Sequence, residues 1–360
     1  MLYTGPGFDM RRKPVRWSTV LAVAVFAAAA CSTPVASSAP TTDAGASAGP
    51  STIAGPSVTP SGPGETHRIG YISGGDSDPF VLLVTEGIRA EAAKAGVELS
   101  ECDSAFEAEK ALTCARTLAA QDLDSMINWQ FFPDSSEAVC EAYGNLPTVA
   151  IDTPEEPCQE TFVGANNREA GLVAGKGLGD FASEKFGCQY DAYITLDFPT
   201  IAEINAARAG GSVEGFEGVC GPIPTDKYFS VDTFAGGPDQ PENSRRQMAD
   251  ILTTLPEAKT ILVISPSGDG MGSAALGAAE VAGRKDQVWI TTHGADPSVR
   301  DAIRNEPQWV GSVAYFPETY GELVMPLAIA LAKGETVAKE VLVEHLFINA
   351  DNIDEFYPAG

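Results

Sequence analysis

Few residues of the chain have side chains suited to catalysis, and their arrangement does not predict an active site. Ser265, Ser267 and His293 are residue types that hydrolases use. Neither serine lies in a Gly-x-Ser-x-Gly motif, and no pattern places a base beside either one. The run Gly171–Lys176 is one residue too short for a phosphate-binding loop, and Gly177 replaces its Ser or Thr. The sequence therefore predicts a protein that is not an enzyme.

One early stretch has the pattern of a ligand-binding loop. The apolar run Ile69–Ile72 predicts a buried strand, and the polar, glycine-rich segment Ser73–Asp78 follows it. Asp78 and Pro79 are typical of the cap and the first residue of a helix. In open α/β sheets, ligands bind where such a loop meets a helix N-terminus. We therefore expect Asp78 to line a binding site and Phe80, directly after the loop, to lie over the bound molecule.

Strand and helix patterns alternate along the rest of the chain, as expected for an α/β protein with doubly wound parallel sheets. Short apolar runs bounded by turn residues predict the strands, and amphipathic segments between them predict the helices. After the first strand, we expect strands at residues 97–99, 126–129, 147–151, 161–164, 191–196, 227–233, 260–265, 288–292 and 311–315.

Length and charge narrow the functional classes. A chain of 360 residues can form two domains with a large core. Its formal net charge of -26 argues against nucleic-acid binding, which needs a basic surface. No Asp-x-Asp-x-Asp-Gly loop predicts calcium binding. An acidic surface that keeps an exported protein in solution explains the charge. The sequence predicts neither a metal nor a cofactor.

The N-terminus is typical of a bacterial export signal. Basic residues between positions 11 and 16 precede an apolar segment, residues 17–30, that is too short for a permanent membrane span. The small residues before Cys31 resemble a lipobox, although Ala28 stands where leucine is usual. We predict a signal peptide over residues 1–30 and lipidation of Cys31. Ordinary secretory cleavage nearby is the alternative, and translation starts at Met1 or Met10.

Residues 32–65 predict a tether between this anchor and the folded part. They consist almost entirely of Ser, Thr, Pro, Ala and Gly, a composition that cannot form a core. Random-coil scaling gives such a segment a reach of roughly 30 Å. We therefore expect an extracytoplasmic protein that is held at the cell membrane by lipid.

The remaining six cysteines predict disulfide bonds, because their number is even and the chain is exported. Fifteen pairings of six cysteines are possible, and we favour those between sequence neighbours, each worth about 2–4 kcal/mol. Without a Cys-x-x-Cys motif, and with few histidines, a zinc site is not expected. The favoured pairs are Cys102 with Cys114, Cys140 with Cys158, and Cys188 with Cys220.

Several segments, taken together in their order and spacing, resemble the ribose/galactose type of periplasmic sugar-binding protein, the substrate-binding component of an ABC importer. The resemblance covers residues 68 to about 347. The segments are IGYISGGDSDPF, PTVAID, VGANNREAG, NAARAGGSVEGF, LVISPSGDGMGSAALGA, ITTHGADP and SVAYFPETYGEL.

This resemblance implies the type I periplasmic binding fold, with two α/β lobes joined by a hinge of three crossovers. Lobe one would comprise residues 66–164 plus 316–344, and lobe two residues 165–315 plus 345–360. One ligand would bind between the lobes. A transcription repressor with the same fold would carry a helix-turn-helix domain where this chain has its export signal.

The resemblance also implies roles for individual residues. Phe80 matches an aromatic residue that stacks on the sugar, and Asp152 matches an aspartate that binds hydroxyl groups. Arg208 matches an arginine that clamps the ligand, with Asn205 one helical turn before it. Asp269 matches an acidic ligand contact. The structural alternatives are a core phenylalanine for Phe80, a turn residue for Asp152 and a helix cap for Asp269. Sugar sites combine aromatic faces with polar groups, and the arginine fork can bind two oxygens at once.

Departures from the family pattern suggest an unusual ligand. His293 replaces an aspartate, Tyr315 a glutamine and Gly268 an asparagine, so we expect His293 and Tyr315 to contact the ligand. A histidine in a turn is the equal alternative for His293. We infer a modified sugar, an oligosaccharide or a cyclitol rather than plain ribose or galactose. The chain also adds three aromatic residues after the third strand, namely Trp129, which we expect in the site, Phe131 and Phe132.

The predicted function is capture of a sugar or sugar-like molecule by hinge closure and its delivery to an ABC permease. Ligand contacts with both lobes would favour the closed form. We expect a monomer. The alternative is a sensor that presents its closed form to a membrane kinase, and the sequence does not separate the two.

Overall fold

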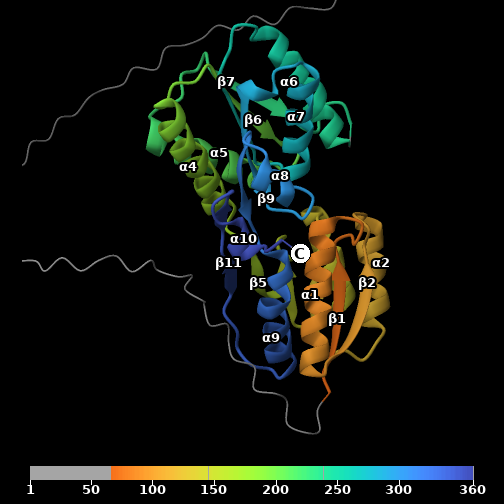
Figure 1. The fold of residues 1–360 in the computed structure, drawn as a ribbon. Coiled ribbons are helices and arrows are strands. Elements are labelled where there is room, and N and C mark those ends of the chain that lie inside the picture. The colour runs from red at the N-terminus through yellow and green to blue at the C-terminus, as the bar shows by residue number, and fades with distance from the viewer. Residues whose placement is uncertain (1–65, 145, 238, 360) are drawn as a thin grey trace, which may run out of the picture. The chain divides into compact units, whose positions relative to one another are not determined.

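The computed structural model describes residues 66–144, 146–237 and 239–359. The predicted signal peptide (residues 1–30), lipidated Cys31 and the tether (residues 32–65) lie outside these residues. No helix within the described ranges is both long and apolar enough to cross a membrane. The chain within these ranges forms two six-stranded sheets with helices on both faces (Figure 1).

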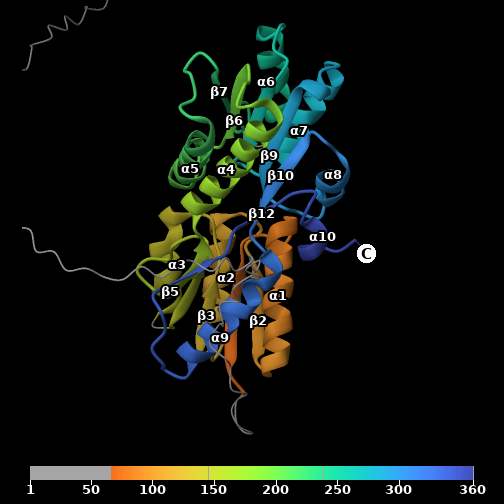
Figure 2. The ribbon, with the colours of Figure 1, turned by 60° about the vertical axis from the view of Figure 1, so that its left-hand side comes forward.

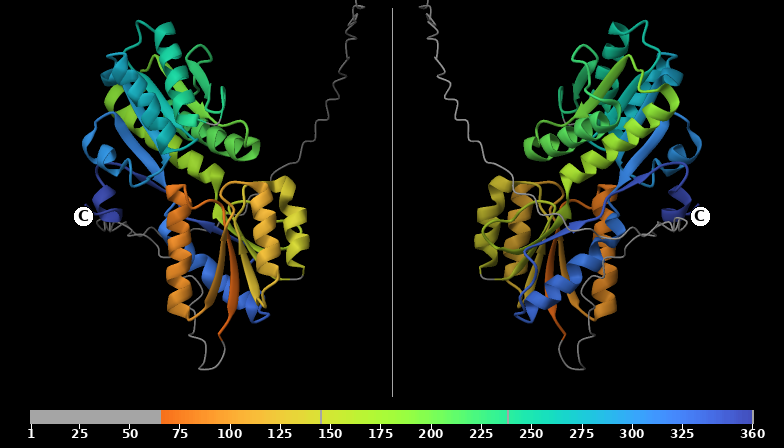
Figure 3. Two further views of the ribbon diagram at one scale, coloured as in Figure 1. Left: turned by 90° about the vertical axis from the view of Figure 1, so that its right-hand side faces the viewer. Right: turned by 90° about the vertical axis from the view of Figure 1, so that its left-hand side faces the viewer.

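The first sheet has the strand order β11-β5-β4-β3-β1-β2, and all its pairs are parallel. Helices α1 and α9 pack on one face, and α2 and α3 on the other (Figure 3). Neighbouring strand residues alternate between these two cores: Tyr71 packs with α1 and α9, and Ile72 with α2 and α3. The strands are β1 (Arg68–Ser73), β2 (Glu98–Asp103), β3 (Ser125–Asn128), β4 (Thr148–Ile151), β5 (Gln159–Ala165) and β11 (Glu340–Val343). The helices are α1 (Pro79–Ala95), α2 (Ala108–Ala119), α3 (Ser136–Tyr143) and α9 (Tyr320–Ala332).

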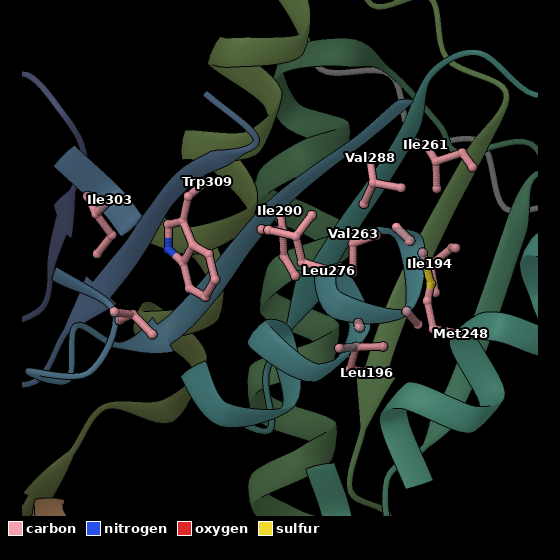
Figure 4. Close-up of a cluster of buried hydrophobic side chains, with 14 of the residues drawn as sticks. Ile194, Leu196, Met248, Ile261, Val263, Leu276, Val288, Ile290, Ile303 and Trp309 are labelled. Atoms are coloured by element: carbon pink, nitrogen blue, oxygen red, sulfur yellow. The ribbon is translucent and has the colours of Figure 1, made fainter. Parts of the chain in front are cut away.

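The second sheet has the order β12-β10-β9-β8-β6-β7. Its apolar core against α6, α7 and α8 includes Ile194, Val263 and Ile290 (Figure 4), and its other face packs on α4 and α5. The strands are β6 (Ala192–Asp197), β7 (Tyr228–Asp232), β8 (Ile261–Ser265), β9 (Val288–Gly294), β10 (Trp309–Ala314) and β12 (Leu346–Ile348). The helices are α4 (Asn167–Phe186), α5 (Ala202–Cys220), α6 (Gln240–Thr254), α7 (Asp269–Val281), α8 (Arg300–Asn305) and α10 (Ile353–Phe356). Short 3-10 helices lie at Pro133–Ser135, Lys285–Gln287 and Pro317–Thr319.

The described chain passes between the two sheets three times: from β5 into α4, from β10 toward α9, and from β11 into β12. The sheets are parallel as predicted, with one exception: β12, which the sequence did not predict, pairs antiparallel with β10 (Figure 2). Only Glu344 and His345 separate β11 from β12. The chain therefore enters the second sheet from the side on which its other strands end, and it runs against them. Sequence analysis missed β11, β12 and α10 because three or four residues show no periodicity.

The structure contains the three disulfides that the sequence favoured. Cys102–Cys114 joins β2 to α2, Cys140–Cys158 joins α3 to the loop after β4, and Cys188–Cys220 joins the turn after α4 to the end of α5. Their Cα atoms lie 5.5, 5.3 and 5.4 Å apart, within the usual range for a disulfide.

Helices α4 and α5 pack backbone against backbone through glycines. A β-carbon at Gly175 would lie 1.9 Å from the carbonyl oxygen of Ser212, and one at Gly171 would lie 2.3 Å from that of Arg208. The glycine-rich run that resembles a phosphate-binding loop is therefore a packing surface. This close approach sets the position of α5, which carries Arg208.

We predict that Gly175→Ala lowers the free energy of unfolding by more than about 2 kcal/mol, because the helices must separate to admit a methyl group. Gly210→Ala is the matched control on α5, where a β-carbon meets nothing within 4 Å and alanine favours a helix by about 1 kcal/mol. Urea unfolding of both variants measures the difference. Equal stability of the two variants would contradict this view of the interface.

Candidate functional site

A cavity of about 510 Å³ lies where strands of both sheets end. Residues after β3 and β4 line it from the first sheet, and residues after β8, β9 and β10 from the second. Its volume is within the range of small-molecule sites. Eight of the nine predicted ligand contacts line it, namely Asp78, Phe80, Trp129, Asp152, Arg208, Asp269, His293 and Tyr315. Whether they bind a ligand stays a prediction.

The ninth residue, Asn205, does not line the cavity. Its side-chain oxygen accepts a hydrogen bond from the backbone N–H of Phe198 at 2.8 Å. This N–H belongs to the loop after β6 and needs an acceptor because a buried donor without one is costly. Asn205 therefore holds this loop, and its place among the ligand contacts stays a prediction.

Phe80 and Trp129 form an aromatic wall on the side of the first sheet. The Phe80 ring makes edge contacts with Trp129, Tyr315 and Tyr320, with ring centres 6.1, 6.2 and 6.0 Å away. Such edge-to-face pairs fix ring orientation. Asp78 caps α1 by accepting hydrogen bonds from the N–H groups of Phe80 and Val81 at 2.9 and 3.2 Å. Trp129 is only 1% exposed, and its Nε1–H has no partner among the described residues. That donor is available to a ligand.

Asp152 is held at the end of β4 with its backbone in the left-handed region (φ 52°). A non-glycine residue adopts this conformation at a cost of about 1–2 kcal/mol. Its Oδ1 accepts hydrogen bonds from the N–H of Ala165 at 3.1 Å and from the hydroxyl of Tyr320 at 3.2 Å. Burial raises the pKa of Asp152 to about 6, although the Ala165 N–H and the Arg208 charge both favour the carboxylate.

Arg208 reaches the cavity from α5 and is held by two neighbouring segments. Its Nε donates to the side-chain oxygen of Asn167, the first residue of α4, at 2.8 Å. Its Nη1 contacts the carbonyl oxygen of Pro266, after β8, at 3.5 Å. The guanidinium carbon lies 4.9 Å from the centre of the Tyr315 ring, a favourable cation–π distance. Arginine is therefore positioned to bind ligand oxygens.

Asp269 borders the cavity, but its oxygens already have partners. The side chain is 1% exposed. Oδ1 accepts hydrogen bonds from the hydroxyl groups of Thr292 and Ser312, and Oδ2 accepts one from the N–H of Asp296 at 2.8 Å. Burial raises the pKa of Asp269 to about 6. Asp269 thus ties together the ends of β8, β9 and β10.

His293 and Tyr315 form a neutral pair on the side of the second sheet. Nδ1 of His293 lies 2.8 Å from the Tyr315 hydroxyl, and Nε2 has no partner among the described residues. Burial, together with the nearby Arg208 charge, lowers the pKa of His293 well below its ordinary value. Burial also raises the pKa of Tyr315 to about 12. Near neutral pH both groups are uncharged and offer hydrogen bonds.

Among the other residues that line the cavity, the sequence missed four with aromatic, amide or carboxyl side chains, namely Phe106, Phe131, Asn167 and Asp296. Phe131 was noted only as an added aromatic residue. Burial raises the pKa of Asp296 to about 7, and the negative charges of Asp269 and Asp78 act in the same direction. Each of the four follows the end of a strand, and this position was the available signal. Within the described part, no group of three or more His, Cys, Asp and Glu residues could hold a metal ion.

Aromatic faces, carboxyl groups, one guanidinium and a neutral histidine suit a ring-shaped ligand rich in hydroxyl groups. Two α/β lobes with such a cavity between them define a two-lobed solute-binding protein. The sequence pattern of the periplasmic binding protein domain matches residues 69–336. The chain belongs to the periplasmic binding protein family, and the predicted family and type I fold are confirmed. Its homologues are substrate-binding proteins rather than enzymes, as predicted.

Individual relatives are similar over most of their length. The ribose import binding protein of Bacillus subtilis (strain 168) is 24% identical over 273 residues, which cover 74% of this chain and 81% of the relative. An ABC transporter solute-binding protein from Mycobacterium smegmatis with bound glycerol is 20% identical, with a TM-score of 0.68 over 82% of this chain and 98% of its own. Another, from Bacillus halodurans C-125 with bound myo-inositol, is 17% identical, with a TM-score of 0.66 over 81% and 97%.

We predict that the Asp152 carboxyl makes the ligand-free protein less stable as pH rises from about 4 to about 6. A pKa of about 6 in the folded state, above the unfolded value near 3.9, means that the folded state binds the proton more tightly in this window. Stability is then lost as the proton leaves. Asp152→Asn should remove roughly 1–3 kcal/mol of this decline.

The measurement is the free energy of unfolding at pH 4, 5, 6 and 7. Asp250→Asn, at an exposed position of α6, is the control and should keep the wild-type slope. An Asp152→Asn slope equal to that of the wild type would show that this carboxyl titrates normally.

Proposed function

We propose that the chain captures a sugar or sugar-like molecule between its two lobes and delivers it to an ABC importer. The observation that carries this proposal is the pairing of Asp152 and Arg208 across one cavity. Asp152 follows β4 of the first sheet, and Arg208 lies on α5 beside the second. The positive charge of Arg208 is close enough to oppose the effect of burial on the pKa of Asp152. A ligand that contacts both residues links the lobes.

The mechanism is hinge closure. A ligand stabilises the closed form only by contacts that the open form lacks. Hydroxyl groups between Asp152 and Arg208 would supply such contacts, and the Phe80 face would cover the ring. Asp152 also accepts the N–H of Ala165 at the end of β5, where the chain crosses to α4. The ligand contact thus sits directly at one of the three crossings.

The relatives favour the ligand class. The Bacillus subtilis protein is named for ribose import, and the two similar structures hold glycerol and myo-inositol. All three molecules carry several hydroxyl groups on a small carbon skeleton. The polar groups of this cavity suit the same chemistry, so a sugar, polyol or cyclitol is the proposed ligand class.

We further propose that the chain acts outside the cytoplasm as a monomeric lipoprotein anchored through Cys31, with an ABC permease in the membrane as its partner. The basic and apolar segments before Cys31 and the tether composition support this proposal. A sensor for a membrane kinase would use the same ligand site and differ in its partner.

Thermal unfolding of the soluble chain from Ser32 onward, against a panel of sugars, polyols and cyclitols, tests ligand capture. A ligand at 100 times its Kd should add about 2.7 kcal/mol of stability. Arg208→Ala and Asp152→Ala should each abolish this gain. Arg245→Ala, at an exposed position of α6 where the side chain pairs with Glu242, should keep it. A folded protein that no member of the panel stabilises would contradict the proposal.

A further inference from the structure

Two phenylalanines extend the aromatic wall from the buried part of the cavity to the surface. The rings of Phe106 and Phe131 are stacked, with centres 5.1 Å apart and an angle of 23° between their planes. Phe131 contacts Trp129 at 5.4 Å, and Trp129 contacts Phe80 at 6.1 Å. Trp129 is 1% exposed, whereas Phe106 is 40% exposed. Four rings therefore form one continuous apolar surface that leads outward from the proposed sugar site.

The rings of Phe106 and Phe131 pack against the glycine-rich loop that follows β1. A β-carbon at Gly74 would lie 2.4 Å from the Phe131 ring, and one at Gly75 would lie 2.3 Å from the Phe106 ring. The N–H of Phe106 donates to the carbonyl oxygen of Gly74 at 2.9 Å, and the Ser104 hydroxyl donates to the same oxygen at 3.0 Å. The backbone of this loop thus fixes the position of the Phe106 ring.

Phe106 is held at a conformational cost. Its φ of 57° lies in the left-handed region, which is rare for a bulky residue and costs of order 1–3 kcal/mol. Despite this cost, two-fifths of its surface stays exposed. A large apolar side chain held at the surface in an unfavourable conformation points to a binding role.

Carboxyl groups from both sheets line the same cavity, namely Asp78 and Asp296. The N–H of Asp78 donates to the carbonyl oxygen of Gly75 at 3.1 Å, and the Phe106 ring packs against the same glycine. The charge of Asp78 acts in turn on Asp296, which lines the cavity from the second sheet. The Asp296 carboxyl oxygens accept no hydrogen bond from any described residue. An aromatic face and a carboxyl group in the same cavity suit a sugar ring, whereas a purely apolar substituent would leave the carboxyl group unsatisfied.

We propose that Phe106 and Phe131, together with Asp296, form a second sugar subsite, and that the ligand is an oligosaccharide of at least two linked rings. One ring binds at Phe80, Asp152 and Arg208, and the next ring stacks on Phe106 nearer the surface. This inference rests on the proposed function, because it extends the same cavity.

Isothermal titration calorimetry on the soluble chain from Ser32 onward tests it with maltose, cellobiose, lactose and melibiose, and with glucose and galactose as their single rings. At least one disaccharide should bind more tightly than either monosaccharide. Phe106→Ala should weaken that disaccharide about tenfold and leave monosaccharide binding within about twofold, because loss of one stacked ring is worth roughly 1.4 kcal/mol.

Two further variants separate binding from structure. Phe132→Ala, next to Phe131 but outside the cavity lining, should leave all affinities unchanged. Phe106→Leu keeps an apolar side chain without the flat ring and should restore only part of the disaccharide affinity.

The outcomes distinguish the two proposals. Monosaccharide binding without disaccharide binding, or disaccharide binding that is insensitive to Phe106→Ala, overturns the second subsite and leaves sugar capture standing. Absence of binding by every sugar of both sets, in a protein that unfolds cooperatively, counts against sugar capture and against the subsite with it.

Discussion

The site depends on one constraint, namely that the ends of the strands of two separate sheets line the same cavity. A loop at the end of a parallel strand carries free backbone groups and side chains that the sheet does not use. Here loops of this kind from both sheets meet, and each supplies what the other lacks. The first sheet contributes most of the aromatic wall and Asp152, and the second contributes His293, Tyr315 and the loops that support Arg208. Only two residues link β11 to β12, so the chain enters the second sheet at the edge where its other strands end. β12 must therefore run antiparallel to them.

The cavity combines three buried carboxyl groups with one guanidinium group. Asp152, Asp269 and Asp296 all have raised pKa values because they are buried. Arg208 is the basic side chain among the described residues that line the cavity, and His293 stays neutral. Hydroxyl groups donate hydrogen bonds to carboxylates and accept them from the guanidinium and the indole, so they satisfy these groups without adding charge. Structural hydrogen bonds already satisfy Asp269, whereas the donor of Trp129 is left open for a partner.

The sequence predicted most of the fold because short apolar strands alternate with helices, some of which begin with clear capping residues, as α1 does at Asp78 and Pro79. It predicted Phe80 because this residue comes directly after the glycine-rich loop, and Asp152 because it matches an aspartate of the family, and both line the cavity. It failed where the local pattern was short or ambiguous. β11 and β12 are too brief to show a period. The sequence also gives no sign that the Asn205 side chain bonds to the loop after β6. Phe106 escaped notice because its importance comes from contact with Gly75, a residue 31 positions earlier.

The disulfides have a mechanical consequence. Cys102–Cys114 and Cys140–Cys158 both close within the layers around the first sheet, and Cys188–Cys220 joins the turn after α4 to the end of α5, beside the second. None of these three cross-links spans the gap between the sheets. The disulfides therefore stabilise each half separately. They place no cross-link on the three crossings between the halves. The three disulfides can therefore stabilise each half without restricting the hinge closure proposed above.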